Sequence, residues 1–81
     1  MDEKYQAAHR YSIHHRKDLE QDETCGCFYC LKIFSPQKII EWIDHEDTAL
    51  CPYCGIDSVI GESSGFPITD VFLRGMHRQW F

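Results

Sequence analysis

The sequence predicts a small α+β fold organised around one bound metal ion. The chain has 81 residues, and a hydrophobic core of that size supplies only about 3–5 kcal/mol, so domains this short often add a metal or disulfides. Hydrophobic residues make up 43% of the chain and aromatic residues 14%, which is typical of a globular domain and not of a disordered segment. Four of the five cysteines form two Cys-x-x-Cys pairs.

The expected compartment is the cytoplasm. No apolar run approaches the roughly 18 residues that a membrane span needs, and the first twenty residues lack the apolar stretch of a signal peptide. Disulfides are rare in a reducing compartment, and five cysteines cannot all pair. We therefore expect a single domain over residues 1–81 that is monomeric and not membrane-bound, with cysteines that act as metal ligands.

The charge balance argues against nucleic acid as a partner. Eight Lys and Arg residues face thirteen Asp and Glu residues, for a net charge of −5, whereas binding to a phosphate backbone requires a surplus of clustered cations. A basic cluster at residues 10–17 is followed at once by Asp18, Glu20, Asp22 and Glu23. We interpret this stretch as a solvated helix face.

The N-terminal segment, residues 1–20, is predicted to be one helix. From Asp2, a possible N-cap, to Leu19 the chain contains no Gly or Pro and is rich in helix formers. The stripe at three- and four-residue spacing is apolar only in part, which suggests loose docking; it consists of Tyr5, Ala8, Ser12, His15 and Leu19. The adjacent His14 and His15 cannot share one helix face, so the histidines are interpreted as surface residues.

The middle of the chain, residues 24–61, is predicted to be the metal-binding core with a short inserted helix. Ser35 followed by Pro36 is a helix-start signal, so a helix is expected from Pro36 to about Ile43 or Asp44. Its apolar residues are expected to be core; they are Ile39, Ile40, Trp42 and Ile43. Strands are expected at residues 48–50 and 58–60, paired as a hairpin that the metal caps.

The last segment, residues 67–81, is predicted to be a helix after a turn-rich stretch at residues 61–67. Thr69 is the expected N-cap and Ile68 the expected staple onto Leu73. The apolar stripe is Phe72, Leu73, Met76 and Trp80. Gly75 should weaken this helix by roughly 1 kcal/mol unless a neighbour packs against its backbone.

Cys27, Cys30, Cys51 and Cys54 are the candidate metal ligands. Each pair can turn both sulfurs to one side of a tight turn, and Gly55 supplies a position with φ > 0 after the second pair. Twenty residues separate Cys30 from Cys51, which matches the spacing of four-cysteine zinc sites. We expect one structural zinc ion; iron in a rubredoxin-like site is the alternative. Four thiolates leave no position for water, so catalysis at the metal is not expected.

Cys25 is the odd cysteine. It lies two residues before Cys27, too close to form another pair of the same kind. Free cysteine is often simply buried, and this is the interpretation we prefer. The alternative is a resolving thiol that displaces Cys27 on oxidation, which requires exposure.

The stretch CGCFYCLKIFSPQKIIEWID…TALCPYCGIDSVIG, continued by GFPITDVFLRGMHRQWF, resembles a group of small bacterial cytoplasmic proteins of unassigned function that carry a rubredoxin-like zinc ribbon. The resemblance covers nearly the whole chain. It implies a zinc-ribbon fold with flanking N- and C-terminal helices, and the four paired cysteines as zinc ligands. It implies no activity.

The expected function is that of a structural zinc-binding module without catalysis, which serves as an interaction or accessory protein with a protein partner. Trp80 and Phe81 are candidate contact residues because aromatic anchors are enriched at interfaces, although packing of the last helix is the interpretation we prefer. The alternatives are iron-based electron transfer and a thiol or zinc redox sensor that uses Cys25.

Overall fold

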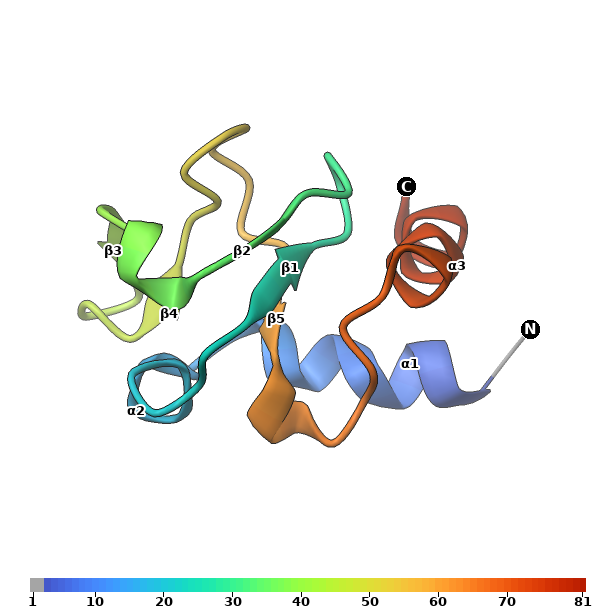
Figure 1. The fold of residues 1–81 in the computed structure, drawn as a ribbon, viewed down its shortest axis with the longest axis horizontal. Coiled ribbons are helices and arrows are strands. Elements are labelled where there is room, and N and C mark those ends of the chain that lie inside the picture. The colour runs from blue at the N-terminus through green and yellow to red at the C-terminus, as the bar shows by residue number, and fades with distance from the viewer. Residues whose placement is uncertain (1–2) are drawn as a thin grey trace.

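The structure, a computed structural model that describes residues 3–81, contains two small antiparallel sheets, one near its centre and one at its side (Figure 1). One sheet has the strand order β2-β1-β5, and the other pairs β3 with β4. From the N-terminus the elements are α1 (Glu3–His9), the 3₁₀ helix η1 (Arg10–Ser12), α2 (Arg16–Leu19), β1 (Cys25–Cys27), β2 (Ile33–Phe34), the 3₁₀ helix η2 (Pro36–Lys38), β3 (Trp42–Ile43), β4 (Thr48–Ala49), β5 (Val59–Gly61), the 3₁₀ helix η3 (Glu62–Ser64) and α3 (Asp70–Trp80). The predicted α+β class is confirmed.

The prediction of one N-terminal helix is wrong, because the helix breaks at residues 13–15. His14 has φ of +48°, and its amide donates to the Thr48 hydroxyl at 2.9 Å. The amides of His15 and Arg16 both donate to the Asp47 carbonyl, at 2.9 and 3.0 Å. Hydrogen bonds to a distant hairpin thus replace those of a continuous helix. The predicted N-cap at Asp2 lies outside the described residues.

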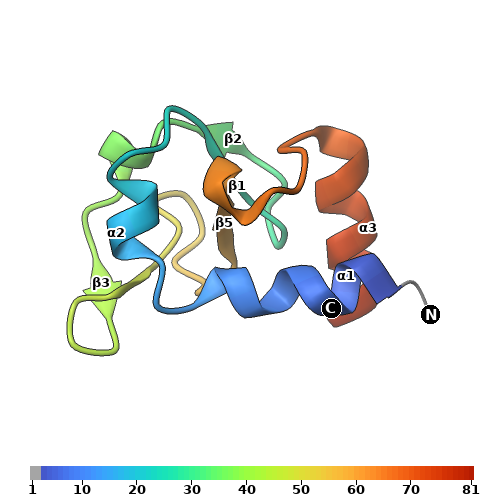
Figure 2. The same cartoon turned by 90° about the horizontal axis from the view of Figure 1, so that it is seen from below.

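The stripe of this segment docks firmly rather than loosely. Ala8, Ser12, His15 and Leu19 are all at most 5% exposed. The interpretation of His15 as a surface residue is therefore wrong, while His14 is exposed as expected. The break turns α2 away from the axis of α1, so that α1 packs against α3 and α2 packs against η3 (Figure 2).

The inserted helix begins where predicted and ends early. The Ser35 hydroxyl accepts a hydrogen bond from the Gln37 amide at 3.3 Å, but only Pro36–Lys38 is helical. The chain is already extended at Ile39 and soon enters β3, because Trp42 and Ile43 pair with Ala49 and Thr48.

Its apolar residues are correspondingly divided between core and surface. Ile39 is buried and Trp42 half-buried, as expected of core residues. Ile40 and Ile43 are 78% and 38% exposed, so their assignment to the core is wrong. An extended chain sends successive side chains to opposite faces, whereas the predicted helix would have grouped them.

The strands of the middle segment occur near the predicted positions with different partners. β4 pairs with β3, and β5 pairs with β1 in the register Cys25↔Gly61 and Cys27↔Val59. The predicted hairpin of residues 48–50 with 58–60 is therefore wrong. With this pairing β1 is the central strand of its sheet, and the first cysteine pair begins where β1 ends.

The last helix agrees with the prediction at both the cap and the apolar stripe. The Thr69 hydroxyl accepts from the Phe72 amide at 3.2 Å. Phe72, Leu73 and Met76 are buried. Trp80 is 38% exposed, and its indole N–H donates to the Tyr5 carbonyl at 3.0 Å, which ties α3 to α1 (Figure 2).

Two hydrophobic clusters divide the interior. One surrounds the four paired cysteines with side chains from α2, β2, β4 and β5; its buried members are Leu19, Cys25, Cys27, Phe34, Ile39, Ala49, Cys51 and Val59. The other lies between α1, α3 and the first cysteine turn, with Ala8, Phe28, Ile60, Phe72, Leu73 and Met76. No helix in residues 3–81 has the length and apolarity to cross a membrane.

Gly75 lies where α1 meets α3, and a methyl group there would overlap the Tyr5 ring. In an open helix Gly→Ala gains roughly 1 kcal/mol. We predict that Gly75→Ala instead lowers the free energy of unfolding by about 1 kcal/mol, because the ring must leave its place. In a Tyr5→Ala background the same substitution should be neutral or stabilising. Urea unfolding of the four proteins measures this difference, and equal effects in both backgrounds would contradict the prediction.

Candidate metal centre

The four predicted ligands, which come from two distant parts of the chain, lie together. The Sγ atoms of Cys27, Cys30, Cys51 and Cys54 all lie within 4.8 Å of one another. Cys27 ends β1, and the turn after it carries Cys30. Cys51 follows β4 by two residues. The two turns project from the same end of the sheets, in green and yellow (Figure 1).

The two turns have the same backbone hydrogen bonds. In the first, the Leu31 amide donates to the Cys27 carbonyl at 2.9 Å, and the Cys27 amide donates to the Lys32 carbonyl at 3.0 Å. In the second, Gly55 donates to Cys51 at 2.9 Å, and Cys51 donates to Ile56 at 3.0 Å. Residues that occupy the same place in each Cys-x-x-Cys pair therefore have the same local structure.

The two turns are also alike in the hydrogen bonds that their sulfur atoms accept. The Tyr29 amide donates to the Cys27 Sγ and the Tyr53 amide donates to the Cys51 Sγ, both at 3.4 Å. An N–H group aimed at sulfur favours the thiolate over the neutral thiol. Each turn thus directs a backbone N–H group at the sulfur of its first cysteine.

The residue after each second cysteine is in the left-handed region. Leu31 has φ of +68° and Gly55 has φ of +78°. For glycine this conformation carries no steric cost, whereas another L-residue pays about 1–2 kcal/mol. Leu31 is half-buried against the cluster of α1 and α3, so packing offsets the strain there.

The sulfur spacing fits a tetrahedral metal ion. Cys27 and Cys54 are 3.6 Å apart at Sγ, and Cys30 and Cys51 are 3.7 Å apart. With Zn–S bonds of about 2.3 Å, the edge of a tetrahedron is about 3.8 Å. The group could therefore bind one ion with little rearrangement.

The electrostatics of the four thiols are unequal. Burial opposes ionisation of Cys27, but the Ser58 hydroxyl at 3.0 Å and the amides of Cys30 and Tyr29 hold its pKa below the ordinary thiol value. Burial and the neighbouring sulfurs raise the pKa of Cys30 and of Cys54. A divalent cation at the centre of the group would instead favour the ionised thiolates, because cysteines bind a metal in their deprotonated form.

Cys25 lies outside this group. Its side chain is fully buried, its Sγ is 3.5 Å from the Phe34 carbonyl oxygen, and burial raises its pKa to about 12. The interpretation of Cys25 as a small buried residue is confirmed.

The histidines contribute no ligand in the part of the chain that the structure describes, where the four cysteines form the one candidate group of metal ligands. His45 is exposed in the β3–β4 loop, with φ of +61°. The sequence analysis missed Ser58, whose hydroxyl contacts the Cys27 sulfur. Nothing in the local sequence distinguishes this serine from the others.

Comparisons with protein-family models, with curated proteins and with solved structures found no match to this chain. The function must therefore be argued from the site. The resemblance to zinc-ribbon proteins remains a prediction.

Gly55 and Gly65 form a matched pair of left-handed glycines, at φ of +78° and +84°, and both have open space where a Cβ would stand. Substitution by Ala should cost each about the same backbone energy. Because a metal site is rarely formed before its ion binds, we expect the strain of Ala at Gly55, which follows a candidate ligand, to weaken Zn²⁺ binding roughly 5- to 30-fold. Gly65→Ala should lower stability without changing the affinity. Competition with a chromophoric chelator measures both; equal affinity losses would contradict the prediction.

Proposed function

We propose that the protein is a structural zinc-binding module of the zinc-ribbon type. The observation that carries this proposal is the convergence of four sulfurs from two turns with the same hydrogen bonds. Four thiolates complete a tetrahedral shell, so the ion stabilises the fold and leaves no position at which water could be activated. Binding energies of such sites, about 10–16 kcal/mol in small peptides, exceed the stability of an ordinary small domain.

Zinc is preferred over iron because the ligand type and the spacing of the pairs are those of structural zinc sites. A rubredoxin-like iron centre uses the same four sulfurs and is the alternative. The redox-sensor alternative gains no support, because Cys25 is buried and its thiolate is disfavoured.

Native mass spectrometry of protein purified without added metal tests the proposal. We expect one zinc per chain, a colourless protein, and loss of the folded charge-state distribution after chelation. Cys51→Ser should retain little zinc, whereas Cys25→Ala, which changes a buried cysteine outside the group, should retain one equivalent. A red protein with one iron would favour electron transfer, and a folded chain without metal would contradict the proposal.

We further propose that the tips of the two cysteine turns contact a protein partner. Tyr29 and Tyr53 occupy the same position in the two pairs and are 44% and 53% exposed. The Tyr29 ring lies 4.9 Å from the ring of Phe81, which is 56% exposed, and Lys32 lies over the Tyr53 ring at 5.5 Å. Exposed tyrosines held by a rigid turn are typical anchors at interfaces. Trp80 is a poorer candidate than the sequence suggested, because it binds α1.

The double substitution Tyr29→Ala, Tyr53→Ala tests this surface, because it preserves both amide–sulfur hydrogen bonds. We expect unchanged zinc content and melting temperature, with at least a tenfold loss of affinity for a partner isolated from the native host. The control is Ile40→Ala, Val71→Ala, which removes side chains that are 78% and 75% exposed elsewhere. Equal losses in both double variants would contradict the assignment.

A further inference from the structure

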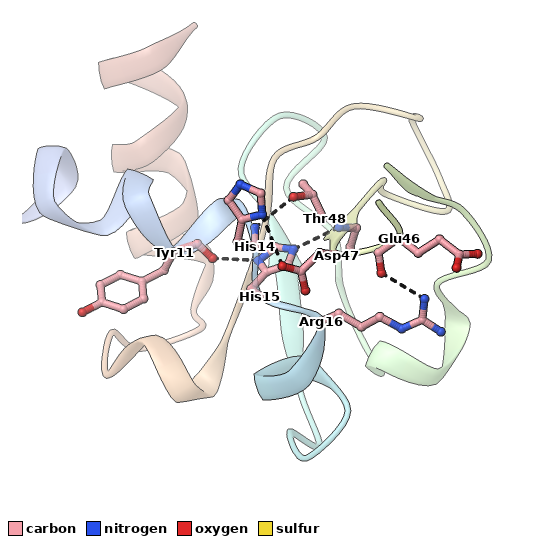
Figure 3. A network of polar contacts seen from close by, with 8 residues as sticks. Tyr11, His14, His15, Arg16, Glu46, Asp47 and Thr48 are labelled. Atoms are coloured by element: carbon pink, nitrogen blue, oxygen red, sulfur yellow. Dashed lines mark hydrogen bonds and ion pairs between the residues drawn. The ribbon is translucent and has the colours of Figure 1, made fainter. Parts of the chain in front are cut away.

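His15 is the one histidine in residues 3–81 that is buried, with 5% of its surface exposed. It lies at the break between η1 and α2, and its ring bridges two segments far apart in sequence (Figure 3). Nδ1 is 2.7 Å from the Tyr11 carbonyl oxygen. Nε2 is 3.1 Å from the Ala49 amide nitrogen in β4.

These two partners determine the protonation state of the ring. A carbonyl oxygen can only accept, so Nδ1 carries the hydrogen. A backbone amide can only donate, so Nε2 must present its lone pair to Ala49. The folded structure therefore requires the neutral imidazole with its hydrogen on Nδ1.

A second proton on the ring cannot be accommodated without movement. It would sit on Nε2, directly opposite the Ala49 N–H, and leave two buried donors facing each other at 3.1 Å. Neither donor would then have an acceptor, and a charge would be enclosed in a site that is nearly inaccessible to water.

The charged groups around the ring do not remove this conflict. Burial is the largest influence and lowers the pKa of His15; the Tyr11 carbonyl, Asp47 of the β3–β4 loop and Asp18 of α2 act in the opposite direction, and His14 adds to the lowering. The Asp47 carboxylate pairs with a different histidine, since it lies 3.2 Å from Nδ1 of the exposed His14 ring.

The remaining contacts between the two segments do not depend on the protonation of His15. The amides of His14, His15 and Arg16 donate to the Thr48 hydroxyl and the Asp47 carbonyl. The Arg16 guanidinium donates to the Glu46 carbonyl at 3.0 Å. Figure 3 shows His14 and Thr48 close to the His15 ring and the contact between Arg16 and Glu46 to one side of it.

We propose that His15 is an acid-sensitive latch: as a neutral imidazole it fastens the N-terminal segment to the β3–β4 hairpin through Ala49, and protonation releases that hairpin. The latch does not depend on which metal the cysteines bind. It acts, however, on the strand that continues through Leu50 into Cys51, so its release loosens the approach to the second cysteine turn.

The direction of the pH dependence follows from the two states. In the open state His15 titrates with an ordinary pKa near 6.5, and in the closed state its pKa is lower. The open state therefore binds more protons below about pH 6.5, and acidification favours opening. The opening equilibrium should rise by up to tenfold for each pH unit below about 6.5.

Nuclear magnetic resonance of the full zinc-loaded chain tests the latch. Long-range ¹H–¹⁵N spectra of the wild type at pH 7.5 should show the neutral Nδ1–H form of His15, which the bonds to the Tyr11 carbonyl and the Ala49 amide both require. Between pH 7 and 5.5 the Ala49 amide, corrected for its intrinsic exchange rate, should lose about tenfold in protection. An Nε2–H form, or protection that does not change with pH, would overturn the proposal.

Two substitutions separate His15 from other titrating groups. His15→Gln places an amide oxygen near the position of Nε2, accepts from Ala49 and does not titrate, so Ala49 protection should vary less than twofold over the same range. His14→Gln, at the exposed neighbour, should keep the wild-type dependence. If His15→Gln retains the wild-type dependence, another group is responsible and the proposal fails. The wild-type spectra decide the question if His15→Gln does not fold.

Discussion

The structure depends on one constraint: four sulfur atoms from two turns must lie within 4.8 Å of one another. Without a cation this arrangement opposes ionisation of Cys30 and Cys54, whose pKa values are raised by burial and by the neighbouring sulfurs. A divalent ion at the centre would convert the same crowding into the strongest attraction in the molecule. The central strand β1 and its partner β5 then act as the support that holds the Cys27 turn in position.

The N-terminal segment uses a second kind of support. His14, His15 and Arg16 give up helical hydrogen bonds and direct their amides at residues 47 and 48 instead. These backbone N–H groups thus keep a hydrogen-bond partner, which a buried backbone group needs. The exchange gains a connection between parts of the chain more than 30 residues apart. The small core at each end of the molecule is thereby joined across the sheets.

Local features of the sequence predicted local features of the structure well. The caps at Ser35 and Thr69 bond the expected amides, and each Cys-x-x-Cys pair forms the same local turn. The strand partners and the helix break were not predictable in this way. Residues 42–43 form a strand because Ala49 and Thr48 are available to pair with them, and no helical pattern in residues 36–43 reveals that partner. His15 belonged to the predicted stripe, but its bond to Ala49 depends on the hairpin.

The two cysteine turns share a backbone but differ in their surroundings. The first is followed by Leu31, which packs against the cluster of α1 and α3, and it contains the buried Phe28. The second contains the exposed Tyr53 and ends in Gly55, where a side chain would meet nothing. The second turn therefore depends more on its connections to the rest of the chain. Those connections include the sulfur group, the contact of the Tyr53 ring with Phe34, and β4, which the His15 ring holds. A metal bound at Cys51 would hold one end of residues 49–51, and the neutral His15 holds the other, so loss of either would act on the same short segment.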